Sequence, residues 1–348
     1  SIYIFFLFFI LFFIKFSTAS ANVNTYKIAD LEISKTYDND FKKEEVIDIA
    51  FKKAFEELIL KITTLNLDEV GKLVNLKNIY GLIDSFSIVD EKFVDNKYVS
   101  KFDVEFSKKE ILKFLEKKNI FPSIPNKKKF LFIPILIDEN KKDLLNFSNN
   151  SIYNKWNDFL KSYHLIEYIL PQDDLEDINF IKKNFDIIEQ YDFKDITKKY
   201  FLKDSIILLI FKNKNEIRVL SRITIKDNVT LKNQSFLNID IKKEDQIEKI
   251  IYELKNIYED YWKKSNQINT SIKLMLNIQV SNTNNDRILK FEKILKETDL
   301  IYDFFITKFN KNNIFYEIVF NGTQNTFLET MGESNYHFDT QNKLWILK

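Results

Sequence analysis

Residues 130–138 read FLFIPILID, a nearly continuous apolar run. This run restricts the possible folds of the chain more than any other feature of the sequence. A run of this kind is typical of a central strand that is buried on both faces of a sheet, because a strand with one solvated face would alternate apolar and polar residues. Residues 205–211 (SIILLIF) have the same character. The two runs predict a sheet with buried central strands in the middle of the chain.

Helical and extended segments alternate around these two runs, and a pair of strands with turn residues follows them. In the order of the chain, we expect a helix from Ser151 to about residue 163, a strand at 165–170, a helix opened by 171–177, a short helix at 193–201, the strand at 205–211, strands at 216–226 and 229–239 with a turn at Asp227–Asn228, and a long helix at 243–264. This order predicts a mixed α/β domain over residues 128–264.

The residues before this domain predict a smaller α+β unit over 22–120. A strand at 25–34 is followed by a long helix whose apolar residues recur at steps of three and four: Ile47, Phe51, Ala54, Leu58 and Ile62. We expect a second helix at 68–80, a hairpin at 85–106 with its turn at Asp95–Asn96, and a closing helix at 108–118. The predicted unit is therefore βααββα.

Two polar segments divide the chain. Residues 119–129 contain two prolines and a lysine triplet, and we interpret them as a linker. Residues 265–270 (SNQINT) connect to a final unit, for which we expect strands at 271–280, 300–309, 313–321 and 343–347 and helices at 284–297 and 323–332. This βαββαβ order is the split βαβ arrangement, so it predicts a ferredoxin-like domain over residues 270–348.

The first residues predict export. Ile2–Ile14 is an uninterrupted apolar run, which suits the core of a signal peptide and is too short for a membrane-spanning helix. Ala19-Ser20-Ala21 fits the small-residue pattern of a signal-peptidase site, so we expect residues 1–21 to be removed after Ala21. The alternative is an uncleaved anchor in the inner membrane, with Lys15 at the interface.

Charge and composition argue against several classes of function. Residues 1–21 carry one charge, so the expected mature chain has equal numbers of basic and acidic residues, and only three of the basic ones are arginine. A nucleic-acid surface needs a basic excess and commonly uses arginine, so we expect no nucleic-acid partner. The chain has no cysteine, which excludes a thiol nucleophile and a Cys-ligated metal.

The acidic stretch at residues 171–177 (PQDDLED) is the candidate site that the sequence offers. In the simplest interpretation Asp173 or Asp174 caps a helix, and Glu176 and Asp177 lie in its first turn, where they face free backbone N–H groups. The stretch also follows a predicted sheet strand, where α/β sheets place ligands. It has neither the glycine nor the spacing of an EF-hand loop. These four acids, with Trp156 on a preceding helix, form a candidate ligand or partner site.

No other motif predicts a cofactor, a metal or a catalytic centre. His164 and His337 fall in different predicted domains, and the four glycines form no phosphate-binding loop. The abundant aromatic residues fall mostly on predicted core positions. We therefore expect neither cofactor nor enzyme activity.

Four segments in order, SIVDEK (87–92), KYVSKFDVEFS (97–107), FIPILID (132–138) and LPQDDLED (170–177), resemble a family of exported proteobacterial proteins known as domain of unknown function two thousand and sixty-six. The middle unit also resembles the amino-terminal domain of TolB-type periplasmic proteins. The resemblance implies a periplasmic or cell-envelope location in a Gram-negative bacterium and no particular activity.

Together these observations predict a non-catalytic exported protein that contacts other envelope proteins, with a membrane contact only through an uncleaved leader. The alternative is an envelope hydrolase, or a cation-binding protein, that uses the carboxylates of residues 173–177.

Overall fold

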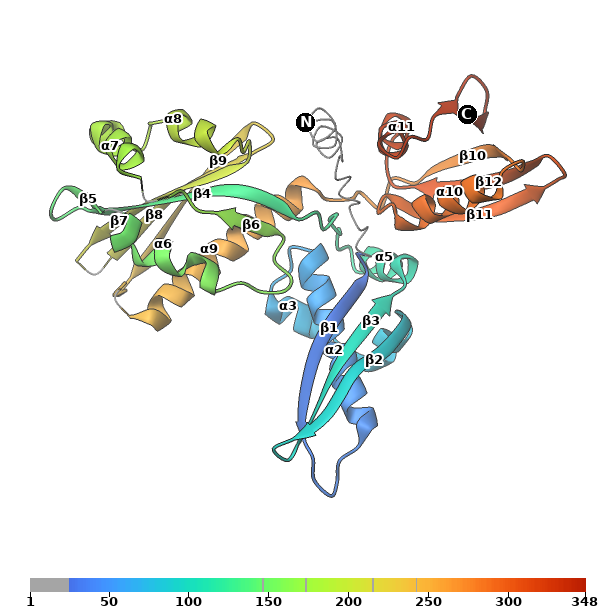
Figure 1. Ribbon diagram of the computed structural model, residues 1–348, viewed down its shortest axis with the longest axis horizontal. Coiled ribbons are helices and arrows are strands. Elements are labelled where there is room, and N and C mark those ends of the chain that lie inside the picture. The colour runs from blue at the N-terminus through green and yellow to red at the C-terminus, as the bar shows by residue number, and fades with distance from the viewer. Residues whose placement is uncertain (1–24, 146, 173, 215, 242) are drawn as a thin grey trace, which may run out of the picture.

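The computed structural model describes residues 25–145, 147–172, 174–214, 216–241 and 243–348, and the predicted signal peptide lies outside these residues. The described chain is a mixed α+β structure with three sheets of three, six and five strands (Figure 1). We refer to residues 25–120, 128–264 and 270–348 as the N-terminal, middle and C-terminal units. None of the helices described here combines the length and the apolar character that a membrane span needs.

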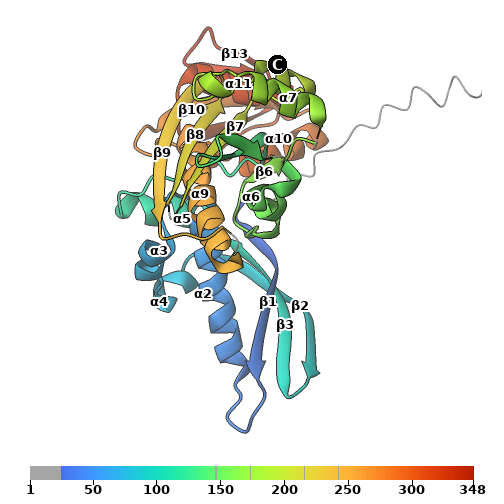
Figure 2. The same cartoon turned by 90° about the vertical axis from the view of Figure 1, so that its left-hand side faces the viewer.

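The N-terminal unit contains β1 (Lys27–Thr36), α2 (Lys43–Ile62), α3 (Leu67–Leu73), α4 (Leu76–Tyr80), β2 (Ile83–Val94), β3 (Lys97–Phe106) and α5 (Lys108–Lys117). Its antiparallel sheet has the order β1-β3-β2, and α2 packs along one face (Figure 2). The expected apolar face of α2 is confirmed, since Phe51, Leu58 and Ile62 are fully buried against alternate residues of β3. Asp95 and Asn96 both have positive φ, as a two-residue hairpin turn requires.

The single helix expected at 68–80 is wrong, because the chain forms α3 and α4 in its place. The side chain of Asn75 accepts a hydrogen bond from the backbone N–H of Asn78 and so starts a new helix. Asparagine competes with the helical backbone in this way at interior positions.

The middle unit contains β4 (Lys128–Asp138), β5 (Asp143–Leu145), η1 (Phe147–Asn149), α6 (Ser151–Lys155), η2 (Trp156–Asp158), β6 (Ile166–Ile169), α7 (Leu175–Lys183), η3 (Phe185–Ile187), α8 (Lys194–Thr197), η4 (Lys198–Tyr200), β7 (Ser205–Asn213), β8 (Glu216–Ile225), β9 (Asn228–Leu237) and α9 (Glu244–Ser265). The strand order is β5-β4-β7-β8-β9, and β6 pairs with the other end of β4 on the β5 side. β4 is parallel to β6 and β7, and β7, β8 and β9 are antiparallel, so the sheet is mixed as expected.

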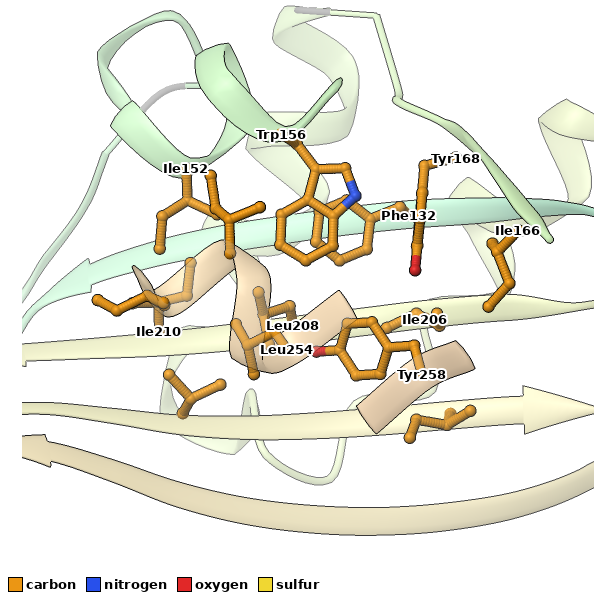
Figure 3. Packing of buried hydrophobic residues seen from close by; sticks show 14 of the residues in the cluster. Phe132, Ile152, Trp156, Ile166, Tyr168, Ile206, Leu208, Ile210, Leu254 and Tyr258 are labelled. Carbon is orange, nitrogen blue, oxygen red and sulfur yellow. The ribbon is translucent and has the colours of Figure 1, made fainter. Parts of the chain in front are cut away.

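Both faces of the middle sheet are covered, which confirms that β4 and β7 are buried central strands. Phe130 and Phe132 of β4 point into a core with α6 and α9, whereas Leu131 and Ile133 point into a second core with α7 and α8. Figure 3 shows part of the first core, between the strands and α9.

Two local expectations in this unit are wrong. The helix at 151–163 ends early as α6 and the 3₁₀ turn η2, and its cap is Asn150, which accepts from the N–H groups of residues 152 and 153. The turn between β8 and β9 is at Lys226–Asp227, one residue earlier than expected. The short helix expected at 193–201 is present, as α8 followed directly by the 3₁₀ turn η4.

The C-terminal unit contains β10 (Leu274–Ser281), α10 (Asn285–Glu297), β11 (Ile301–Phe309), β12 (Asn313–Phe320), α11 (Gln324–Glu333), β13 (Phe338–Asp339) and β14 (Leu344–Leu347). The sheet order is β11-β12-β10-β14-β13, with β10 parallel to β14 and antiparallel to β12. The elements follow the expected βαββαβ succession, and β13 is an addition that the sequence did not indicate.

The segment expected to be a linker is hydrogen-bonded to the units on either side of it. Ser123 N donates to Ile62 O at the end of α2 (2.6 Å), and Ile124 N donates to Asn266 O (2.9 Å). The indole N–H of Trp262 donates to Asn126 O (2.7 Å). Residues 122–126 therefore join the end of α2 to the end of α9.

Candidate functional site

The acidic stretch begins a helix, as the simplest interpretation of its sequence predicts. Asp174 is the N-cap of α7, and its side chain accepts from Glu176 N (2.9 Å). Glu176 and Asp177 occupy the first turn. Asp173 lies outside the described residues. The capping prediction is confirmed for Asp174.

A lysine from another element neutralises these acids. Lys199 Nζ in η4 lies 2.6 Å from Asp177 Oδ1, 2.8 Å from Glu176 Oε2 and 4.0 Å from Asp174 Oδ2. Asp177 is only 1% exposed, whereas Glu176 and Asp174 face solvent. Hydrogen bonds to the carboxylates raise the pKa of Lys199, so its positive charge is held among them. A cation that bound all three carboxylates would have to displace this lysine. No cluster of metal-ligating side chains occurs within the described ranges.

Trp156 lies on the opposite face of the middle sheet from the acidic stretch. Its side chain is fully buried and stacked on Phe132, with ring centroids 3.9 Å apart. Figure 3 shows the indole against this ring, with Tyr168 and Tyr258 nearby. Asp177 flanks the second core, on the face that α7 and α8 cover. The structure therefore separates Trp156 from the acids, and its position is that of a core residue.

The two histidines are also far apart in the fold. His164 is buried at the end of the loop before β6, and its Nδ1 accepts from Lys161 N (3.3 Å). Burial, together with the nearby Lys255 and Lys263, lowers the pKa of His164 to about 4, so this ring is neutral at pH 7. His337 is exposed in the C-terminal unit.

A cleft with a volume of about 790 Å³ lies where the N-terminal and C-terminal units meet. The sequence did not indicate it, because its walls come from segments far apart in the chain. Its polar lining includes Tyr26, Lys61, Lys108, Lys127, Asp299 and Asp303.

The most buried charges of this cleft connect the two units. Lys108 Nζ, at the start of α5, donates to Thr298 O (2.8 Å) and Lys296 O (3.1 Å) at the end of α10. A cation at this position satisfies free carbonyls and complements the negative end of the helix dipole. Burial lowers the pKa of Lys108 to about 8 and raises the pKa of the neighbouring Asp299. Lys109 pairs with Asp303 at 2.6 Å.

A second set of buried charges lies along α9. Lys255, Glu259 and Lys263 are four residues apart and almost inaccessible to solvent. The Glu259 carboxylate accepts from the N–H groups of Leu165 (2.9 and 3.0 Å) and Ile166 (2.9 Å), which fixes the start of β6. Burial raises the pKa of Glu259, and these two backbone N–H groups oppose the increase.

The two lysines of this set bind carbonyl groups. Lys255 Nζ donates to Phe159 O (3.0 Å), and burial lowers its pKa to about 8. Lys263 Nζ donates across the junction to Leu60 O (2.6 Å) in the last turn of α2. The sequence does carry a signal for this set of buried charges, since charged residues recur every four positions directly after the core residues 254, 258 and 262.

The chain matches no protein-family model and no curated protein.

Proposed function

We propose that the protein is exported to the cell envelope and acts there by binding other proteins through the edges of its sheets, without catalysis. One observation carries the proposal: large exposed apolar side chains gather on a terminal strand of each sheet. They are Phe86, Val89, Phe93 and Val94 on β2, Val229, Leu231 and Leu237 on β9, and Phe305, Ile306 and Phe309 on β11.

The physical reason is that a terminal strand already exposes unpaired backbone groups. Such a strand can accept a further strand, and apolar side chains on it add affinity when they become covered. Monomeric proteins commonly guard these edges with charges, bulges or short strands. Apolar edges are therefore better suited to a chain that has protein partners.

The placement of the buried charges supports a binding role over a catalytic one. Lys108 in the cleft donates to two backbone carbonyls, and Lys263 at the junction donates to a third. A catalytic acid or base must instead reach a substrate proton. Here Lys108 and Lys263 instead connect neighbouring units.

We propose further that the three units are domains, that the C-terminal one is ferredoxin-like, and that the chain is a divergent relative of the exported family it resembles. The support is the strand order 2-3-1-4 of β10, β11, β12 and β14, and the order of the four matching segments. The apolar run before Ala19-Ser20-Ala21 supports periplasmic delivery.

The test is photo-crosslinking in intact cells, with a benzophenone side chain in place of Phe93, Leu231 or Phe309. An exposed position on α9, Glu253, is the matched control. We expect discrete adducts with envelope proteins from at least one edge position and none from the control. Equal labelling at all four positions would contradict the proposal.

The alternative, a carboxylate-dependent hydrolase or a cation site at residues 173–177, has less support because Lys199 already occupies the centre of these acids. Replacing Asp174 and Asp177 with Asn decides between them. Under our proposal the crosslinking pattern is unchanged. Loss of a hydrolytic activity, or of Ca²⁺-dependent stabilisation, in this variant would favour the alternative.

A further inference from the structure

One terminal strand, β9, lacks the two features that hinder the other terminal strands from pairing with a further strand. The pairing of β1 with β3 has one register shift, and β2 and β11 have two each against their neighbours. The remaining terminal strands that the structure describes, β5, β6 and β13, have two to four residues. β9 instead pairs with β8 without interruption from Asn228 to Leu237. Bulges and short strands hinder edge-to-edge pairing, and β9 has neither.

The composition of β9 also does little to hinder pairing with a further strand. Its ten residues (NVTLKNQSFL) contain no proline and one charge, Lys232. Val229, Leu231 and Leu237 are 58%, 59% and 69% exposed. Figure 2 shows β9 at the outer margin of the middle sheet. The amide of Gln234 is buried without a hydrogen-bond partner, which is costly in a folded protein.

We propose that β9 pairs with β9 of a second copy of this chain, antiparallel about a two-fold axis normal to the sheet, to form one continuous sheet across the dimer. This inference rests on the proposed function and names the partner of one of its edges. A two-fold axis of this kind keeps each side chain on its own face, so a residue can be its own partner across the axis.

The charge of Lys232 selects the register. The two registers with the longest overlap are centred on Lys232 and on Asn233. The first places two lysines directly opposite each other, which is unfavourable. The second places Lys232 opposite Gln234 of the partner subunit, so no like charges lie opposite each other.

The same register matches the apolar residues. With Asn233 on the axis, Val229 lies opposite Leu237 of the partner subunit, and Thr230 lies opposite Phe236 of the partner subunit. Apolar and β-branched pairs of this kind stabilise the pairing of antiparallel strands. This match of apolar residues, with no like charges opposite each other, favours a second copy over an unrelated strand.

The test uses the absence of cysteine from the chain. In the purified mature protein, Asn233→Cys places two thiols opposite each other across the axis. Ser235→Cys, exposed on the same strand, instead places each thiol opposite Leu231 of the partner subunit. Ser87→Cys on β2, also exposed, is the matched control. Under mild oxidation we expect Asn233→Cys to form a covalent dimer roughly tenfold or more faster than either control, because pairing gives the thiols an effective concentration in the millimolar range.

A second measurement, the mass of the protein in solution, tests the proposal without an added cysteine. By light scattering, the unmodified mature protein should have twice the mass of a single mature chain at high concentration. The double substitution Val229→Lys and Leu231→Lys adds charge to an exposed edge, so it should leave a folded monomer with an unchanged far-UV spectrum. A monomer at every concentration, or equal oxidation rates for the three cysteine variants, would overturn the pairing.

Failure here and failure of the proposed function are distinguishable. Envelope adducts from Phe93 or Phe309 with no β9 dimer would leave the proposed function standing and overturn the pairing. A benzophenone at Leu231 that labels only another protein would likewise overturn the pairing. Labelling of the protein's own chain from Leu231 would support it.

Discussion

Removal of the charge of Lys263 should loosen the junction between the N-terminal and middle units. Its ammonium group is buried and donates to Leu60 O (2.6 Å), one of the carbonyls at the end of α2 that has no partner within the helix. Lys263→Met keeps the length of the side chain and removes the donor. The next residue, Lys264, is exposed on the same helix, so Lys264→Met is the matched control.

The magnitude follows from opposing effects. A buried carbonyl left without a donor costs about 1–3 kcal/mol, and the hydrogen bond lost is assisted by charge. Burial lowers the pKa of Lys263, so the ammonium group is itself imperfectly solvated and its removal returns part of this cost. We expect a net loss of about 2 kcal/mol in the free energy that keeps the junction closed, which corresponds to about 30-fold in the opening equilibrium.

Amide hydrogen exchange measures that opening directly. The N–H groups of Ser123 and Ile124 donate to Ile62 O and Asn266 O across the junction, so they are protected only while it is closed. Both should exchange about 30-fold faster in Lys263→Met and at the original rate in Lys264→Met. Unchanged protection at Ser123 in the first variant would refute the reasoning, since the carbonyl contact would then contribute nothing to the junction.

Three further results are expected. The pKa of His164 is about 4 in the folded chain and about 6.5 in the unfolded chain, so the unfolded chain takes up the proton first as pH falls. Up to about 3 kcal/mol of the free energy of unfolding should be lost between about pH 6.5 and about pH 4. In a urea-unfolding series over this pH range, His164→Phe should flatten the loss, and the exposed His337→Gln should not. Asp177→Ala removes a buried carboxylate from its lysine and should cost about 1–3 kcal/mol in urea unfolding, against at most about 0.5 kcal/mol for the exposed Glu176→Ala; equal losses would contradict the difference in burial. Trp156→Ala should cost about 3–5 kcal/mol, and a near-neutral result would argue against its role in the core.

Local sequence pattern was sufficient for most of the secondary structure. The run at 130–138 indicated a strand buried on both faces, and β4 divides the two cores of the middle unit. The helical steps from Ile47 to Ile62 indicated the buried face of α2. These predictions succeed because the repeat of a helix or a strand by itself decides which side chains share a face.

The first residues of individual helices were harder to predict because single polar side chains decide where a helix begins. Asn150 starts α6 one residue before the expected cap, and Asn75 divides what looked like one helix. Both asparagines bond to nearby backbone N–H groups, and this chain has many asparagines that could do the same.

The sequence by itself determined where most of the strands and helices lie, that the acids at 174–177 begin a helix, and that motifs for phosphate or thiol chemistry are missing. Only the tertiary structure decided that Lys199 neutralises those acids, that Trp156 lies across the sheet from them, and that Lys108 and Lys263 connect the units. The physical reason is distance along the chain: Lys263 and Leu60 are 203 positions apart, and no periodic pattern relates a side chain to a carbonyl at that separation.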